Sequence, residues 1–344
     1  MPDSDVLILG AGPAGSAAAI AAAGAGLRVA LVERSAFPRS APGESLHPGV
    51  MPLLRQLGVE RQVLAAGFLR HEGHFVQWNA PRRFVPFGAD EEGPWLGLQA
   101  WRPAFDALLL ERARQLGVRV LQPCRPVGLR RSGAAVAGVV TDRGAVESTF
   151  VVDATGRRRW LSRQLGLHAD LASPPLTAWY GYLQDDDPDP DRDPSGCPTL
   201  VGASGGWTWT ARVRPNLRQW TQLSLNHRQR PGAGPPPQLA PGKPLGRARG
   251  VDVTWAVAAA PAGPGYYLVG DAAANLDPAS SHGVLRAIMS GIMAAHLIAA
   301  VAGGKISQDD AAAAYTLWVR DWFAREVAAL RELYAVLTSP GPGP

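Results

Sequence analysis

Runs of apolar residues, broken by glycine and polar turns, predict alternating strands and helices from the N-terminus onward. Asp5-Val6-Leu7-Ile8-Leu9 is continuously apolar after its first residue, as expected for a strand buried on both faces of a sheet. A glycine-rich turn follows at once, and an alanine-rich stretch predicts a helix over about 13–25. Leu27 to Val32 reads as the second strand. The first third of the chain therefore predicts an α/β fold.

The turn between the first strand and its helix reads Gly10-Ala11-Gly12-Pro13-Ala14-Gly15, which is a G-x-G-x-x-G motif. Gly10 permits the tight turn, Gly12 lets the backbone approach a pyrophosphate, and Gly15 allows close packing of helix and strand. Glu33 ends the second strand, 18 residues after Gly15, where a carboxylate suits a ribose hydroxyl pair and opposes a 2′-phosphate. This set predicts dinucleotide binding, but it does not by itself separate FAD from NAD.

Later segments favour FAD. Arg102 precedes a helix expected over 103–116, where it can reach a phosphate or the ribityl chain, although a surface arginine is the alternative. Phe150 to Gly156 is a strand ending in Asp153-Ala-Thr-Gly, a common pattern in which Asp153 can orient the phosphate loop. Tyr266 to Ala273 is another strand and contains Gly270-Asp271, whose carboxylate can bind a polyol. The long apolar helix that begins near Gly283 directs its N-terminus at an electron-rich ring edge.

Taken in order, these motifs resemble the FAD-dependent monooxygenase superfamily with the glutathione-reductase-type FAD fold. That superfamily contains aromatic hydroxylases, flavin-dependent halogenases and geranylgeranyl reductases. Pro42-Gly-Glu-Ser-Leu46 resembles a segment of the halogenase-like and reductase-like branch. Asp277-Pro-Ala-Ser-Ser-His-Gly283 is similar to a segment of flavoproteins that hydroxylate a tryptophan of a partner protein during quinone-cofactor maturation.

The resemblance implies an α/β, Rossmann-like FAD-binding domain with an inserted substrate-binding β-sheet domain and a C-terminal helix. The expected limits are 1–70, 98–170 and 255–304 for the discontinuous FAD-binding domain, 71–97 and 171–254 for the substrate domain, and 305–344 for the C-terminal helix and tail.

The expected site divides into cofactor-binding and catalytic residues. The expected FAD contacts are Gly10, Gly12, Ala14, Gly15, Glu33, Arg34, Glu44, Ser45, Arg102, Asp153, Gly156, Gly270, Asp271, Pro278, Ser281 and Gly283. His47 and His282 are the candidates for proton transfer, because the family places both loops near the isoalloxazine ring. A lone histidine is more often a structural hydrogen-bonding residue, and that alternative stays open.

The halogenase branch carries a Trp-x-Trp-x-Ile-Pro segment and a lysine between flavin and substrate. Here Trp207-Thr-Trp209-Thr is followed by Ala-Arg, and no lysine occurs before Lys243. Trp207 and Trp209 lie on the same face of an expected strand of the substrate domain, so packing on its core is the other interpretation of the pair. The sequence therefore offers no residue for the halogenating group.

Charge and composition narrow the possibilities further. The chain has a formal net charge of +5, but its 34 basic residues are scattered arginines apart from Lys243 and Lys305, so nucleic-acid binding is not expected. Two cysteines support neither a disulfide framework nor a four-cysteine zinc site, and no metal site is predicted. Arg286 and His296 interrupt the apolar stretch 284–301, so we expect no integral membrane segment and a cytoplasmic protein.

The sequence as a whole indicates an FAD-dependent monooxygenase that hydroxylates an aromatic substrate with molecular oxygen through a flavin hydroperoxide. The expected partner is an aromatic small molecule or a tryptophan of a partner protein. No second G-x-G-x-x-G unit is present, so electrons come from transiently bound NAD(P)H or from a separate flavin reductase. The alternatives are a geranylgeranyl-reductase-like enzyme, a halogenase-like enzyme and a non-catalytic flavin-binding maturation partner.

Overall fold

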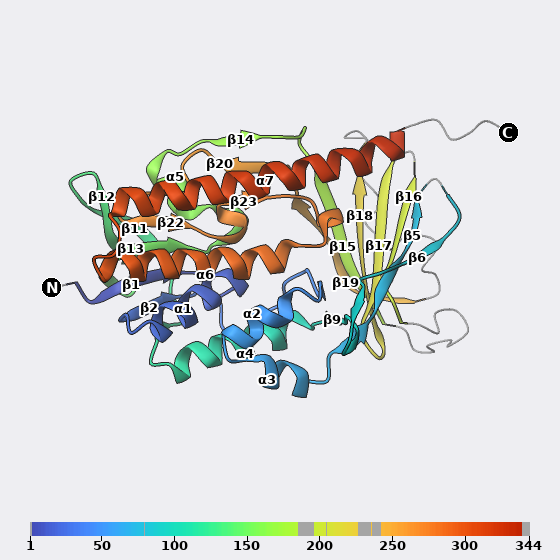
Figure 1. Cartoon of the computed structure of the whole chain (residues 1–344), viewed down its shortest axis with the longest axis horizontal. Coiled ribbons are helices and arrows are strands. Elements are labelled where there is room, and N and C mark those ends of the chain that lie inside the picture. The colour runs from blue at the N-terminus through green and yellow to red at the C-terminus, as the bar shows by residue number, and fades with distance from the viewer. Residues whose placement is uncertain are drawn as a thin grey trace.

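The computed structural model describes residues 2–78, 80–184, 196–203, 205–225, 235 and 242–338. Two sheets stand at opposite ends of the molecule, and the helices α6 and α7 run lengthwise beside the first of them (Figure 1). The expected tail after residue 338 lies outside the described residues.

The first sheet is the eight-stranded one that contains the predicted first strand, and its central strands are parallel. Its order is β10 (Arg119–Leu121), β2 (Val29–Val32), β1 (Ser4–Leu9), β13 (Gly144–Asp153), β12 (Ala135–Thr141) and β11 (Pro126–Ser132), with β22 (Tyr266–Leu268) beside β13 and β21 (Ala262–Gly263) beside β22. Leu7, Ile8 and Leu9 are fully buried, which agrees with a strand covered on both faces.

Helix α1 (Pro13–Gly24) packs on the parallel strands of this sheet and against two further helices, α4 (Arg102–Gln115) and α6 (Gly283–Ala302). A Cβ on Gly291 would lie 2.2 Å from the Ala14 carbonyl oxygen, so only glycine allows α6 to approach α1 this closely. The first turn of α1 is thereby fixed against the middle of α6.

The second sheet is seven-stranded and mainly antiparallel. Its order is β19 (Lys243–Asp252), β15 (Thr177–Gln184), β18 (Leu217–Ser224), β17 (Gly206–Arg214), β16 (Thr199–Ala203), β5 (Gly73–Trp78) and β6 (Arg83–Pro86). Segments from both sides of α4 in the sequence therefore build one sheet, although the domain limits given above remain a proposal.

Smaller elements connect the two sheets. The short strands are β3 (Ser45–Leu46), β9 (Gly97–Gln99) and β4 (Leu69–His71) in one sheet, β14 (Ala169–Leu171), β20 (Ala256–Ala258) and β23 (Ala274–Asn275) in another, and the hairpin of β7 (Ala89–Asp90) and β8 (Gly93–Pro94). Within the described residues, the remaining helical elements are α2 (Val50–Gln56), α3 (Glu60–Ala65), α5 (Trp160–Leu165) and the short turns η1 (Gly156–Arg158), η3 (Gly270–Ala272) and η4 (Pro278–Ser280).

The C-terminal helix α7 (Gln308–Thr338) extends from beside the eight-stranded sheet to the seven-stranded one (Figure 1). Tyr315 is fully buried and donates to the Leu268 carbonyl, at the end of β22. By length and composition, α6 is the one described helix that could cross a membrane, with 39% of its apolar window buried in the protein. It packs against α1 and α7.

Candidate functional site

The turn between β1 and α1 has the geometry that a pyrophosphate needs. Gly10 has φ of +102°, and a Cβ on Gly15 would lie 1.9 Å from the Gly10 carbonyl oxygen. A Cβ on Gly12, in contrast, would have Arg39 Nη2, at 3.5 Å, as its nearest neighbour. Because Ala14 and Gly15 stand in the first turn of α1, their N–H groups face this open space.

Arg39 is a residue that sequence reasoning missed. Its guanidinium lies beside the open face of Gly12, it forms an ion pair of 3.4 Å with Asp106, and its Nε atom is buried without a hydrogen-bond partner. Only the tertiary fold brings this loop arginine to the phosphate turn. Since arginine pairs well with phosphate oxygens, Arg39 is suited to neutralise a pyrophosphate there.

Glu33 lies directly beside the turn and is 5% exposed. Its two carboxylate oxygens accept the backbone N–H groups of Ala11 and Ser35, both at 2.8 Å. These bonds hold the carboxylate in place and leave acceptor capacity on each oxygen for ribose hydroxyls.

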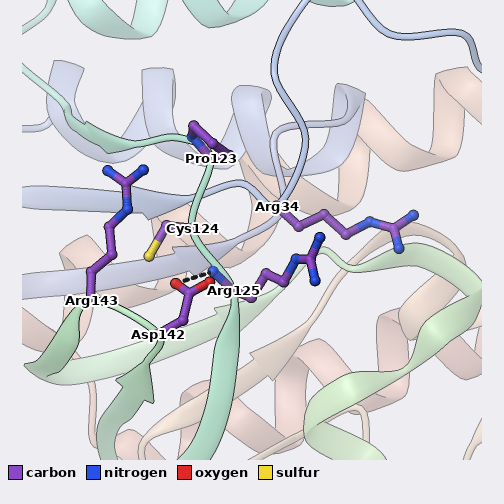
Figure 2. Close-up of a pocket in the computed structure, with 6 residues that line it drawn as sticks. All are labelled: Arg34, Pro123, Cys124, Arg125, Asp142 and Arg143. Carbon is purple, nitrogen blue, oxygen red and sulfur yellow. Dashed lines mark hydrogen bonds between the residues drawn. The ribbon is translucent and has the colours of Figure 1, made fainter.

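A cavity of about 310 Å³ lies next to Glu33. One of its lining residues, Cys124, donates its N–H to the Glu33 carbonyl at 2.8 Å. Figure 2 shows its lining, which consists of Arg34, Pro123, Cys124, Arg125, Asp142 and Arg143. The Asp142 carboxylate accepts the Arg125 N–H at 2.9 Å, which ties the two walls together. The cavity adjoins the acid that we expect to bind ribose, so it suits the adenosine end of a dinucleotide.

Arg102 is directed away from open space. It is 7% exposed, forms a buried ion pair with Asp106 at 2.8 Å and donates to the Pro42 carbonyl at 2.6 Å. It therefore holds the loop that leads to Glu44, and its expected direct contact with a phosphate or ribityl chain remains a prediction.

Glu44 is 2% exposed and connects this loop to the seven-stranded sheet. The Tyr182 hydroxyl and the Gly43 N–H donate to its carboxylate. Burial raises the pKa of Glu44, and the Tyr182 hydrogen bond and Arg102 oppose that rise. Ser45, next along the chain, donates to the Gln99 side chain at 2.8 Å across the β3–β9 pair.

Asp153 ends β13, and Asp271 lies in the turn η3, which follows the neighbouring strand β22. Asp153 is fully buried and accepts the N–H groups of Thr155 and Leu161, so it shapes the turn through Gly156, where φ is +64°. Asp271 forms an ion pair of 3.1 Å with Arg157, and Gly270, with φ of +58°, donates its N–H to Ser290. Arg157 is a second residue that the motif analysis did not select.

The loop before α6 carries the remaining candidates. Asp277 caps the turn η4 by accepting the Ala279 N–H, and Pro278 begins that turn. Ser281 has φ of +55°, an uncommon conformation for a residue with a Cβ, and Gly283 is the first residue of α6.

His47 and His282 lie next to each other, with ring centroids 5.1 Å apart. The Gly49 N–H donates to His47 Nδ1 at 3.0 Å, so a neutral His47 carries its proton on Nε2. Burial, His282 and His74 lower the pKa of His47, which favours that neutral form. His282 Nδ1 lies 3.3 Å from Glu326 of α7.

Phe87, which directly follows β6, and Trp209 of β17 link this histidine pair to the seven-stranded sheet. The Phe87 ring lies 5.2 Å from His47, 5.3 Å from His71 and 6.0 Å from His74. Trp209 lies 5.9 Å from His74. The cluster of His47, His71, His74, His282, Phe87 and Trp209 is hereafter called the histidine–aromatic cluster, and it joins the loops before α2 and α6 to the sheet.

The residues present fit a flavin dinucleotide. The space at Gly12 would be filled by a Cβ, Arg39 has an unpartnered buried nitrogen, and the Ala11 N–H fixes the Glu33 carboxylate beside the turn. No group of described residues forms a cluster suited to a metal ion.

The FAD-binding domain family matches residues 3–218. The chain is 27% identical over 363 residues to the tryptophan 2-halogenase of Chondromyces crocatus, covering 96% of this chain and 68% of that protein. It is 28% identical over 382 residues to the menaquinone reductase of Mycolicibacterium smegmatis, covering 98% and 85%.

Solved structures give the same result for the fold. CndH, the myxobacterial chondrochloren halogenase, matches with a TM-score of 0.87 at 25% identity, over 96% of this chain and 82% of its own. The flavin-dependent halogenase CmlS matches with a TM-score of 0.85 at 25% identity, over 99% and 66%. The chain thus spans about two thirds of the length of CmlS and of the tryptophan 2-halogenase. The predicted α/β FAD-binding fold is confirmed.

Proposed function

Because this chain belongs to the FAD-binding domain family and is an FAD-dependent oxidoreductase, we propose that it is a monooxygenase that hydroxylates an aromatic substrate. The proposal rests chiefly on the histidine–aromatic cluster, in which Phe87 contacts His47, and His47 contacts His282. Trp209 is linked to this group through His74 and Phe87. Rings of this kind stack on and enclose a flat aromatic molecule.

FAD supplies the reaction with dioxygen once it is bound and reduced. The chain's own residues bind and orient the substrate and shield it from water. The Nε2–H of neutral His47 is a hydrogen-bond donor for a hydroxyl or carbonyl group of the substrate. Phe87 and Trp209 present apolar surface that excludes water from the ring being oxidised. Glu44, held by Tyr182, fixes the loop before His47.

The distribution of lysine supports hydroxylation over halogenation. The halogenase-like branch has a lysine between flavin and substrate, and here the two lysines are both exposed. Lys243 begins the edge strand β19, and Lys305 follows the end of α6. Neither belongs to the histidine–aromatic cluster.

Halogenation is the second candidate, because several relatives are named as halogenases. Reduction of a prenyl or quinone-type chain is a third, favoured by the relatives named menaquinone reductase and digeranylgeranylglycerophospholipid reductase. These names belong to those proteins, and the assay decides between the three reactions.

The test supplies reduced FAD protein with isotopically labelled dioxygen, halide and a panel of phenols, indoles and tryptophan-containing peptides. Hydroxylation predicts a product that gains one labelled oxygen atom and does not depend on halide. A product in which halogen replaces hydrogen would overturn the proposal, as would saturation of a prenyl substrate without dioxygen. The peptides test the proposed partner-protein tryptophan against a small aromatic molecule.

The electron source is tested in the same assay by supplying NADH or NADPH with and without a flavin reductase. Turnover with the nicotinamide alone supports direct reduction, and a strict need for the reductase supports a two-component system. We retain the cytoplasm as the proposed location.

A further inference from the structure

Asp277 is a buried carboxyl group in the loop that leads to His282 and α6. It is 1% exposed and accepts three hydrogen bonds. Trp255 Nε1–H and the Tyr334 hydroxyl both donate to Oδ2 at 2.9 Å, and the Ala279 N–H donates to Oδ1 at 2.8 Å. All three donors are uncharged.

Donor and acceptor chemistry fixes the direction of this network. An indole N–H can only donate, so Trp207 Nε1, at 2.6 Å, must donate to the Tyr334 oxygen. The single hydroxyl hydrogen of Tyr334 is then available for Asp277. Both oxygens of Asp277 act as acceptors, Oδ2 of two hydrogen bonds and Oδ1 of one. The ionised carboxylate accepts from every donor of the network.

Two opposing effects act on the pKa of Asp277. Burial raises the pKa of Asp277, while the hydrogen bonds from Trp255, Tyr334 and Ala279, together with attraction to Arg157, oppose that rise. Burying a charge among neutral donors is unfavourable unless each hydrogen bond is formed. Loss of one donor should therefore disturb the whole loop.

The network joins four segments that are distant in the sequence. Trp207 lies on β17 of the seven-stranded sheet, Trp255 precedes β20, Asp277 caps η4, and Tyr334 lies near the end of α7. The Tyr334 ring also contacts Trp255, with centroids 5.7 Å apart. In Figure 1, α7 spans the distance between the two sheets. Tyr334 lies in the last turns of this helix, which ends at Thr338.

We propose that Tyr334 is a positioning residue of the flavin site, which acts through Asp277 to fix the loop 277–283 against the cofactor. Trp207 and Trp255 complete the unit. Because Trp207 is two residues from Trp209 on β17, the unit also ties the substrate side of the cluster to that loop. This inference rests on the proposed function, in which the loop 277–283 faces the flavin.

Two tyrosines on α7 provide a matched test. Tyr334→Phe removes the hydroxyl that bonds Asp277, and Tyr315→Phe removes a hydroxyl of the same helix that is fully buried and bonds the Leu268 carbonyl instead. We expect Tyr334→Phe to raise the FAD dissociation constant roughly tenfold, because a hydrogen bond to a buried charge is lost. It should also shift the visible absorbance bands of the bound flavin, and Tyr315→Phe should change neither.

Equal behaviour of the two variants would overturn the inference while leaving the proposed function intact. Absence of FAD binding by the wild-type chain would instead refute the function itself. Asp277→Asn tests the pathway, because Tyr334→Phe should weaken FAD binding no further in that background. Additive effects of the two substitutions would show that Tyr334 does not act through Asp277.

Discussion

At the scale of single residues, Gly12 and Gly15 perform different tasks in one turn. A Cβ on Gly15 would collide with the Gly10 carbonyl, so this glycine is required for the turn to fold. A Cβ on Gly12 meets no atom closer than 3.5 Å, and its φ of −72° suits any residue. Gly12 is therefore required only by what binds there.

This difference predicts that Gly12→Ala folds normally but binds FAD at least roughly tenfold more weakly, because the methyl group occupies the space of the pyrophosphate. Gly15→Ala should lower the melting temperature even without FAD. Thermal unfolding of the apoproteins and FAD titration separate the two effects. Wild-type affinity in Gly12→Ala would exclude this turn as the pyrophosphate site.

His71 is a second residue whose surroundings have a measurable consequence. It is 4% exposed, its Nδ1 bonds the Gly73 carbonyl, and its Nε2 is buried without a partner. Burial lowers the pKa of His71 from 6.5 to about 4. The folded protein therefore holds the neutral ring, and protonation favours the unfolded chain.

Because the folded pKa lies below the unfolded value, stability is complete above about pH 6.5 and falls as the pH decreases toward about 4. We expect His71 to account for a loss of about 2 kcal/mol by about pH 5. Urea unfolding of His71→Phe at both ends of this range should show a correspondingly smaller loss. His168→Gln, at an exposed histidine, is the control and should behave as wild type.

At the scale of elements, the start of α4 and the loop after β2 share one acid. Asp106 pairs with the buried Arg102 at 2.8 Å and with the half-buried Arg39 at 3.4 Å. Arg102 holds the Pro42 carbonyl, whereas Arg39 reaches the open face of Gly12. Arg102 thus supports the fold, whereas Arg39 has an unpartnered Nε–H and can bind an anion.

We therefore expect two matched variants to differ in opposite ways in their stability and their FAD binding. Arg102→Met should lower the free energy of unfolding by about 3 kcal/mol or more, because Asp106 and the Pro42 carbonyl lose a buried partner. Arg39→Met should leave stability almost unchanged and weaken FAD binding, with a reduced dependence of affinity on salt concentration. If Arg39→Met is as unstable as Arg102→Met and binds FAD normally, the division of roles is wrong.

At the scale of the whole molecule, the proposed FAD contacts come from β1–α1, the end of β2, and the turns after β13 and β22. These strands lie side by side in one sheet. In the sequence, however, more than 200 residues separate β1 from β22. A ligand that bridges them stabilises the folded state as a unit.

We accordingly expect FAD at about one hundred times its dissociation constant to stabilise the protein by about 2.7 kcal/mol. Thermal unfolding with and without ligand measures this gain. FMN lacks the adenosine half and cannot reach Glu33 or the cavity beside Arg34, so it should stabilise the protein less at the same concentration. Equal stabilisation by FMN would mean that the cavity is not the adenosine site.

The sequence by itself determined the β1–α1–β2 unit, and its ordered motifs predicted the FAD-binding fold and the C-terminal helix through their resemblance to a known superfamily. The β1–α1–β2 unit depends on local spacing, such as the interval from Gly15 to Glu33, and on apolar periodicity within each element. Local patterns are complete within a few dozen residues, so they can be read before the chain is folded.

Only the tertiary structure decided which side chains meet. It assigned Arg102 to Asp106, brought Arg39 to Gly12, and placed Phe87 among the histidines. It also joined Trp207 to Tyr334, 127 residues further along the chain. Such pairs carry no spacing signal, because their distance is set by how sheets and helices pack after each has formed. The same packing gives Trp207 and Trp209 different partners, Tyr334 and His74, although the two tryptophans lie on the same face of one strand.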